Sequence, residues 1–158
     1  MGYAKITSEK LVIPTYQLGE PEKAPLFFDL RNHQGTRGNV YPIPMIDKFL
    51  NRKEDRAYDA IRLENEFLRV TLLPELGGRI YEGYDKKADH HFVYKNNVIK
   101  PAMIGLAGAW ISGGIEFNWP QHHRPTTFMP VDSFVEASED GEQTAWMGEI
   151  EPLFGTKG

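Results

Sequence analysis

The 158-residue sequence contains no cysteine, which excludes disulfide bridges, thiolate zinc sites and a cysteine nucleophile. It also lacks an excess of basic charge, because 18 Lys and Arg residues stand against 22 Asp and Glu residues, a net charge of −4. Such a chain has no positive field to hold a nucleic-acid backbone or an anionic membrane. We therefore expect neither nucleic acid nor membrane among its partners.

Long apolar runs are missing as well. The longest apolar stretch, residues 98–111, is interrupted by Lys100, Pro101 and several glycines, and it is shorter than the ~20 residues that a membrane span needs. Residues 1–5 contain no apolar segment of the kind found in a signal peptide. From these absences we predict a cytoplasmic location.

The residues that are abundant favour β structure. The sequence has 15 glycines and 11 prolines, and 12% of its residues are aromatic, a profile typical of strands joined by turns. Segments 60–64, 67–73, 79–85 and 90–95 follow one another at about ten-residue spacing, and polar and apolar residues alternate in several of them. This pattern predicts a mainly β fold, an antiparallel β-sandwich with at most short helical turns.

The chain divides by pattern into two parts. Residues 1–57 are predicted to be a peripheral, loop-rich segment, in which residues 10–18 form an edge strand and the charged run 51–56 lies in a loop. Short extended pieces are expected at residues 25–30 and 40–45. Residues 58–158 are predicted to hold the antiparallel strands of an incomplete β-sandwich domain.

The second half of the chain contains the remaining predicted elements. Residues 99–109 are rich in Ala, Met, Leu and Ile, and they are the one place where a short helix is plausible. A strand is expected at 115–119 and a Pro- and His-rich loop at 120–130. Strands at 131–137 and 143–150 are joined across Asp140-Gly141, the strongest hairpin signal in the sequence.

The densest group of chemically useful side chains lies in residues 110–124. It contains Trp110, Glu116, Asn118, Trp119, His122, His123 and Arg124. In an extended strand, Glu116 and Asn118 share one face, while Phe117 and Trp119 share the other. A carboxylate beside an amide, with an indole nearby, suits the hydroxyls and the apolar face of a sugar ring. The plainer alternative is that the aromatic residues are core and that Glu116 is salt-bridged.

The adjacent histidines invite a metal hypothesis, because imidazole is a common metal ligand. Neighbouring residues of a strand point to opposite faces, however, so His122 and His123 could share one ion only in an irregular loop. A neutral histidine that hydrogen-bonds a ligand, or a solvated loop histidine, is favoured over a metal ligand, and we predict no metal and no other cofactor. For the pair His90-His91 we expect one ring inward and one outward.

The turn Leu76-Gly-Gly-Arg-Ile80 is glycine-rich, but no helix follows it. It therefore lacks the strand, loop and helix arrangement of a phosphate cradle. Its default interpretation is a tight turn that needs positive φ angles. Arg79, at the start of the next strand, could reach a ligand cleft.

Two segments, LENEFLRVTLLPELGGRI (63–80) and GGIEFNWP (113–120), resemble galactose mutarotase-like β-supersandwich proteins. More narrowly, they resemble the uncharacterised mutarotase-like domain that precedes tetratricopeptide arrays in some large bacterial proteins, over about residues 60–150. The resemblance implies a sugar-binding cleft whose wall candidates are Arg79, Glu116, Asn118, His122, His123 and Arg124, with Trp110 or Trp119 as stacking platform. We assign acid–base roles first to Glu116 and His122, by analogy with the His and Glu of the epimerases.

The resemblance also has gaps. Aldose epimerases have a histidine just before the glycine pair, where this chain has Ile111 and Ser112, and their later catalytic residues would fall beyond Gly158. Mutarotation is therefore unsupported, and the predicted function is a carbohydrate-binding or carbohydrate-active domain. Related supersandwiches are much longer, so the chain resembles an N-terminal half with uncovered strand edges, and we expect a homo-oligomer through those edges. The alternatives are a protein-interaction β module and a His-based metal site.

Overall fold

The computed structural model describes residues 4–21, 23, 25–27, 40–44, 46–103, 109–118, 128–150 and 155–158. As predicted, the fold is mainly β and its sheets are antiparallel. The strands are β1 (Lys5–Leu18), β2 (Pro25–Phe27), β3 (Val40–Pro44), β4 (Phe49–Glu64), β5 (Leu68–Leu73), β6 (Arg79–Asp85), β7 (His90–His91), β8 (Ala102–Met103), β9 (Ala109–Trp110), β10 (Asp132–Ala137) and β11 (Gln143–Gly148). A single 3₁₀ turn, η1 (Pro74–Leu76), joins β5 to β6. Among these residues, no helix is long and apolar enough to cross a membrane.

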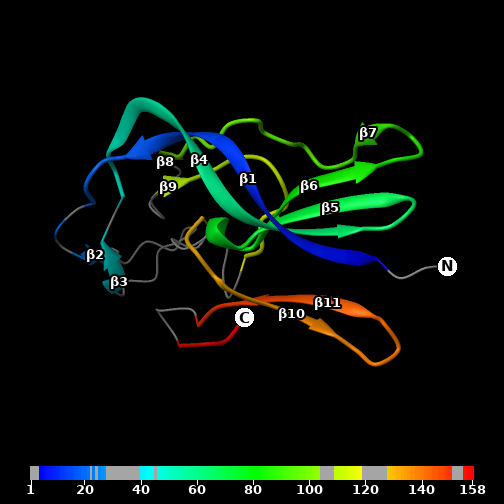
Figure 1. Ribbon diagram of the computed structural model, residues 1–158. Coiled ribbons are helices and arrows are strands. Elements are labelled where there is room, and N and C mark those ends of the chain that lie inside the picture. Colours follow the sequence, from blue (N-terminus) through cyan, green and yellow to red (C-terminus); the bar gives the residue numbers. More distant parts are fainter. Residues whose placement is uncertain are drawn as a thin grey trace.

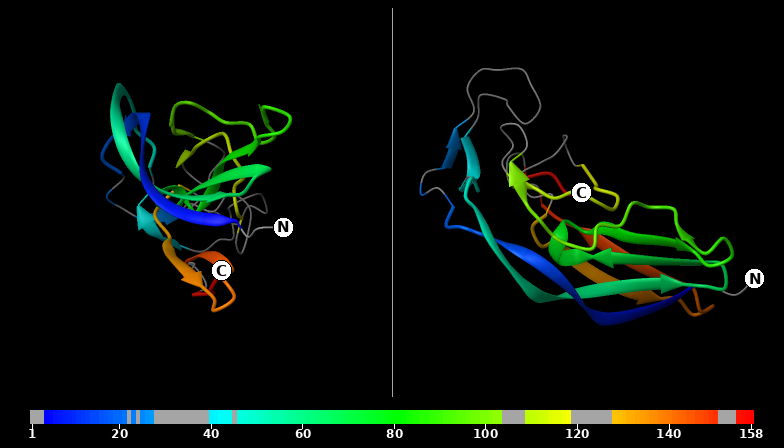
Figure 2. Two further views of the ribbon diagram at one scale, coloured as in Figure 1. Left: turned by 45° about the vertical axis from the view of Figure 1, so that its right-hand side comes forward. Right: turned by 90° about the horizontal axis from the view of Figure 1, so that it is seen from above.

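The strands form two layers (Figures 1 and 2). The larger layer is a five-stranded sheet in the order β1-β4-β5-β6-β7, and the hairpin β10-β11 lies against one of its faces. The pairs β2-β3 and β8-β9 are small separate ribbons. The predicted sandwich is thus confirmed, with β1 at the edge of the main sheet as expected.

Successive side chains of a strand point to opposite faces of the main sheet, and apolar side chains lie on both faces. Each face therefore has its own hydrophobic core. Between the main sheet and the hairpin, Ile6, Ile61 and Leu72 are buried against the half-buried side chains of Ala145 and Met147. The opposite face buries a larger cluster, Ile13, Tyr58, Ala60, Leu73, Leu76 and Tyr81, under Ile99, Ala109, Ile111 and Phe128. Because both faces are covered, the segments after β7 form part of the core.

The prediction of a loop over residues 51–56 was wrong. These residues belong to β4, which pairs with β1 from Lys5↔Glu64 to Leu18↔Phe49. Their charged side chains are exposed, so the local sequence resembles a solvated loop. The strand forms because a distant partner, β1, satisfies its backbone hydrogen bonds.

The helix predicted over residues 99–109 is also absent from the described part of that segment. Ile99 instead hydrogen-bonds β1, donating to Pro14 O at 2.9 Å and accepting from Tyr16 N at 2.9 Å. Ala102–Met103 and Ala109–Trp110 are short paired strands. Pairing with distant strands has overridden the local helix preference.

Three smaller predictions can be compared with the structure. The strand at 90–95 shrinks to the two residues of β7, and both of its histidines are exposed, so the inward ring was wrong. Of the strand predicted at 115–119, the described residues 115–118 form one bridge, between Ile115 and Ile80. The Asp140-Gly141 hairpin is confirmed, with Gly141 at a φ of 87° and Phe134 directly opposite Trp146 in the register.

Candidate functional site

Arg79 is almost fully buried, with 2% of its surface exposed. Gly77 and Gly78 precede it at φ angles of 74° and 67°, which confirms the predicted tight turn. The Nη1 group of Arg79 donates to Gly113 O at 2.6 Å and to Ile111 O at 3.3 Å. The guanidinium therefore ties the start of β6 to the chain that follows β9.

Glu116 joins this arrangement from the next segment. Its Oε2 lies 3.6 Å from Nη2 of Arg79, and the indole Nε1 of Trp110 donates a hydrogen bond to the same oxygen. The structure thus brings together three residues that the sequence proposed for the site: Arg79, Trp110 and Glu116. Of the plainer alternative, the salt-bridged Glu116 is confirmed by the contact with Arg79, but Phe117 is not a core residue, because 47% of its surface is exposed.

The other predicted site residues are Asn118, Trp119, His122, His123 and Arg124. Asn118 is exposed, and Trp119, His122, His123 and Arg124 lie outside the described residues. No group of three or more His, Asp or Glu residues within the described ranges is arranged to hold a metal ion.

Phe117 takes part in a different feature, a cleft of about 280 Å³ beside the β10-β11 hairpin, which the glycine turn before β6 also lines. Phe117 and Trp146 are its aromatic walls, with 47% and 57% of their surfaces exposed. Gly77, Gly78 and Gly148 also line it, so part of its surface is bare backbone. We call it the Phe117–Trp146 cleft. Sequence alternation predicted that Phe117 and Glu116 would diverge, but it gave no sign that Phe117 and Trp146 would line the same cleft.

A second cavity, of about 570 Å³, is bordered by β1, β4 and η1. It lies beside the larger core cluster, the one that contains Tyr58 and Leu76. Thr15 Oγ1 donates to Ile13 O at 2.9 Å, so the hydroxyl of Tyr58, 2.9 Å away, donates to Thr15. Burial raises the pKa of Tyr58 above its ordinary value. At the rim, Arg56 pairs with Glu75 at 3.0 Å. Sequence analysis gave no signal for this cavity, because its walls come from distant segments.

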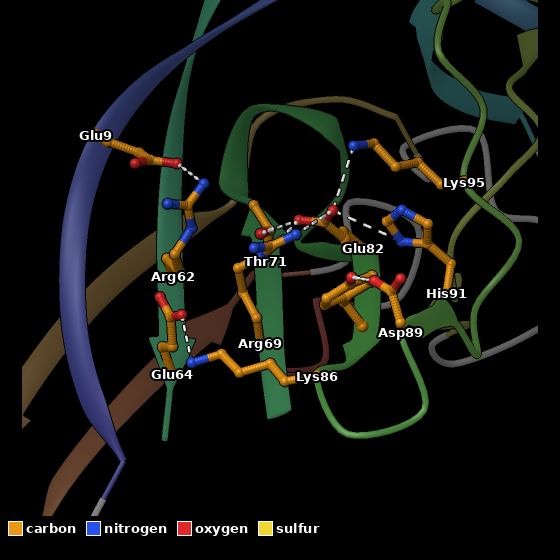
Figure 3. Close-up of polar contacts among 11 residues, drawn as sticks. Glu9, Arg62, Glu64, Arg69, Thr71, Glu82, Lys86, Asp89, His91 and Lys95 are labelled. Atoms are coloured by element: carbon orange, nitrogen blue, oxygen red, sulfur yellow. Dashed lines mark hydrogen bonds and ion pairs between the residues drawn. The ribbon is translucent and has the colours of Figure 1, made fainter. Parts of the chain in front are cut away.

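A buried carboxylate, Glu82 on β6, is the centre of the polar network in Figure 3. Only 5% of Glu82 is exposed. Arg69 reaches it with two nitrogens at 3.2 and 3.3 Å, Thr71 donates to it at 3.0 Å, and Lys95 lies at 3.3 Å. The ring of His91 lies 3.6 Å from the same carboxylate. The sequence analysis missed this cluster, although Arg69 and Thr71 alternate with apolar residues and therefore share a face.

The network continues across the sheet as separate ion pairs. Arg62 meets Glu9 at 2.5 Å, and Lys86 meets Glu64 at 2.6 Å (Figure 3). Each of these charges already has a protein partner of opposite sign. We therefore interpret this half of the sheet face as a stabilising charge network, and we place the ligand site elsewhere.

The Glu82 cluster predicts a dependence of stability on pH. Burial alone would raise the pKa of Glu82, but the hydrogen bond from Arg69 and the charge of Lys95 lower it by more, so the folded pKa lies below the ordinary 4.5. A carboxylate with a lowered folded pKa stabilises the protein above its unfolded pKa and loses that contribution as the pH falls toward the folded value.

We therefore expect Glu82→Gln to lower the free energy of unfolding at pH 7, and the gap from wild type to narrow as the pH drops below about 4.5. Urea titrations at several pH values measure this. Glu64→Gln is the matched control, because Glu64 is more exposed and has one cationic partner, Lys86; its loss at pH 7 should be smaller. A Glu82→Gln gap that widens in acid would contradict the prediction.

Together, the fold and these contacts define an antiparallel β-sandwich domain with an aromatic cleft at the junction of its layers. The family model described as "Domain of unknown function (DUF5107)" matches residues 36–157, and the chain belongs to this family. The chain is also similar to the crystal structure of a TPR-domain containing protein from Parabacteroides distasonis ATCC 8503, with a TM-score of 0.77 and 25% sequence identity. The match covers 96% of this chain and 25% of that protein, so the chain corresponds to a quarter of its length. The expected relation to an uncharacterised domain is confirmed, as is the similarity to a tetratricopeptide-containing protein.

Proposed function

We propose that this chain is a carbohydrate-binding domain and that a sugar ring occupies the Phe117–Trp146 cleft. The observation that carries the proposal is a cleft that two half-exposed aromatic residues, Phe117 and Trp146, line together with glycine backbone. An aromatic face packs against the apolar C–H face of a pyranose, while backbone amides and carbonyls serve its hydroxyls. The resemblance of segments 63–80 and 113–120 to galactose mutarotase-like proteins supports the same ligand class.

The size and polarity of the cleft favour a short ligand. Its volume of about 280 Å³ lies just below the ~300–1,000 Å³ range of small-molecule sites. Glu149 is an acidic residue among those that line the cleft. We therefore expect one sugar unit, or the end of an oligosaccharide, to be held there.

In this proposal Arg79, Trp110 and Glu116 are positioning residues. They hold segment 113–118 against β6, and that segment carries Phe117 to the cleft. The sequence hypothesis gave Glu116 an acid–base role, but its contacts with Arg79 and Trp110 support an anchoring role. The proposal is therefore one of binding, without a catalytic step.

The test is calorimetric titration with a panel of glucose, galactose, mannose, xylose, N-acetylglucosamine and their short oligosaccharides. We expect at least one sugar to bind, and we expect Phe117→Ala and Trp146→Ala each to weaken that binding by roughly tenfold, because each removes a stacking surface. Phe134→Ala is the matched control, since Phe134 is an exposed aromatic residue of the same hairpin that does not line the cleft.

Two results would overturn the proposal. The first is a wild-type protein that binds no sugar of the panel. The second is a sugar that binds Phe117→Ala as tightly as wild type. Thermal melting curves of each variant show whether the fold is retained, which is expected because the replaced side chains are half-exposed.

A further inference from the structure

The outer face of the β10-β11 hairpin carries aromatic side chains that the sandwich does not use. The side chains of Met147 and Ala145 point to the core between the hairpin and the main sheet. Because side chains alternate along a strand, the residues next to them point to the outer face. On that outer face Phe134 and Trp146 lie directly opposite each other, and 62% and 57% of their surfaces are exposed. Figure 1 shows the hairpin at the lower edge of the molecule, with the main sheet on one side of it.

The hairpin is also strongly acidic. Residues 131–150 contain six acidic residues and no Lys or Arg, a charge of −6, whereas the whole chain carries −4. The rest of the chain therefore carries −4 − (−6) = +2. The negative charge of this protein is concentrated on the element that exposes the aromatic pair.

A shallow hollow of about 250 Å³ lies within this surface. Phe134 and Trp146 line it together with Asp132, which lies opposite Gly148 in the register. The carboxylate of Glu136 accepts a hydrogen bond from the indole Nε1 of Trp146 at 3.0 Å. The hollow is thus lined by two aromatic residues and one acidic residue, Asp132, and a second carboxylate, that of Glu136, lies beside it on the indole of Trp146. We call it the Phe134–Trp146 hollow.

We propose that the Phe134–Trp146 hollow binds an arginine or lysine side chain of a basic polypeptide partner. A cation over the face of an aromatic ring is attracted by the electron density of that ring, and the attraction is strongest for tryptophan. Asp132 and Glu136 add charge attraction, and the other carboxylates of the hairpin attract further basic residues of the same partner. The occupant is thus a cationic peptide segment.

This surface is distinct from the Phe117–Trp146 cleft, although Trp146 borders both. Phe117 lines only the cleft, while Phe134 and Asp132 line only the hollow. Substitutions at these positions therefore separate the two proposals. Either of them can fail without the other.

The experiment measures fluorescence polarisation of a labelled octapeptide of alternating alanine and arginine against the full chain. The same peptide with citrulline in place of arginine keeps the shape and removes the charge. We expect the arginine peptide to bind. The affinity of the citrulline peptide should be lower by roughly tenfold or more. Phe134→Ala and Asp132→Asn should each weaken arginine-peptide binding by about three- to thirtyfold.

Two control variants complete the design. Phe117→Ala should leave peptide binding unchanged. Glu139→Gln removes one carboxylate of the same hairpin that does not line the hollow, and it should change the affinity by less than Asp132→Asn does. Equal binding of the arginine and citrulline peptides would overturn the proposal, as would equal losses in Glu139→Gln and Asp132→Asn. Concentration-dependent self-association that Phe134→Ala abolishes would also overturn it, because the surface would then belong to a second copy of the chain.

Discussion

Replacing Arg79 with methionine is expected to lower the free energy of unfolding by about 3–5 kcal/mol, because one buried guanidinium serves several acceptors at once. The substitution leaves the carbonyl oxygens of Ile111 and Gly113 without that donor, and it leaves the carboxylate of Glu116 without its cation. Urea denaturation followed by circular dichroism measures the loss. Sugar binding should weaken too. Arg79 holds segment 113–118 against β6, and this segment carries Phe117, which lines the proposed sugar cleft.

Two further variants make this result interpretable. Arg56→Met removes a similar ion pair, with Glu75 at 3.0 Å, but from a half-exposed site, so it should cost no more than about 1 kcal/mol. Arg79→Lys keeps the positive charge but not the planar fork of donors, so it should recover only part of the loss. If Arg79→Met is as mild as Arg56→Met, the buried guanidinium does not organise this region.

The parts of the fold that sequence reasoning predicted are the parts with local signals. Alternation marked β5 and β6, two adjacent glycines marked the turn before Arg79, and Asp140-Gly141 marked the hairpin. In each case the information lies within a few residues of the element. Neighbouring strands joined by short turns can therefore be recognised from one sequence.

The errors arose where distant contacts decide the structure. The exposed, charged start of β4 becomes a strand only because β1 pairs with it along its length. Ile99 sits in a segment with helix-forming residues, yet its backbone bonds go to Pro14 and Tyr16. No local pattern carries this information, because the partners are more than 30 residues apart in the first case and more than 80 in the second.

The candidate site shows the same division. Side-chain chemistry singled out Arg79, Trp110 and Glu116, and the structure brings them together. The main acceptors of Arg79, however, are backbone carbonyls. Every residue has one, so the sequence does not show which carbonyls a side chain will contact. The Glu82 cluster was missed because the β5-β6 register is irregular between Thr71 and Leu72. This irregularity changes which side chains of β6 share a face with Thr71. The roles of Trp119, His122, His123 and Arg124, and the homo-oligomer through strand edges, stay predictions.

Gly114→Ala is expected to be the second strongly destabilising change, at about 2–5 kcal/mol, because it combines backbone strain with a steric clash. Gly114 has a φ of 74°, and a Cβ there would lie 2.3 Å from the carbonyl oxygen of Ile80. That oxygen accepts the hydrogen bond from Ile115 N at 2.8 Å, so the clash pushes segment 113–118 away from β6.

Gly141→Ala isolates the strain, because Gly141 has a φ of 87° and open space around it. It should cost only about 1–2 kcal/mol in the same urea titration. The two variants also differ in function: Gly114→Ala should displace Phe117 and weaken sugar binding, whereas Gly141→Ala, in the turn of the hairpin, should leave it unchanged. Equal losses of stability in the two variants would show that the close contact between Gly114 and Ile80 does not hold segment 113–118, and the positioning role of that segment would then have to be abandoned.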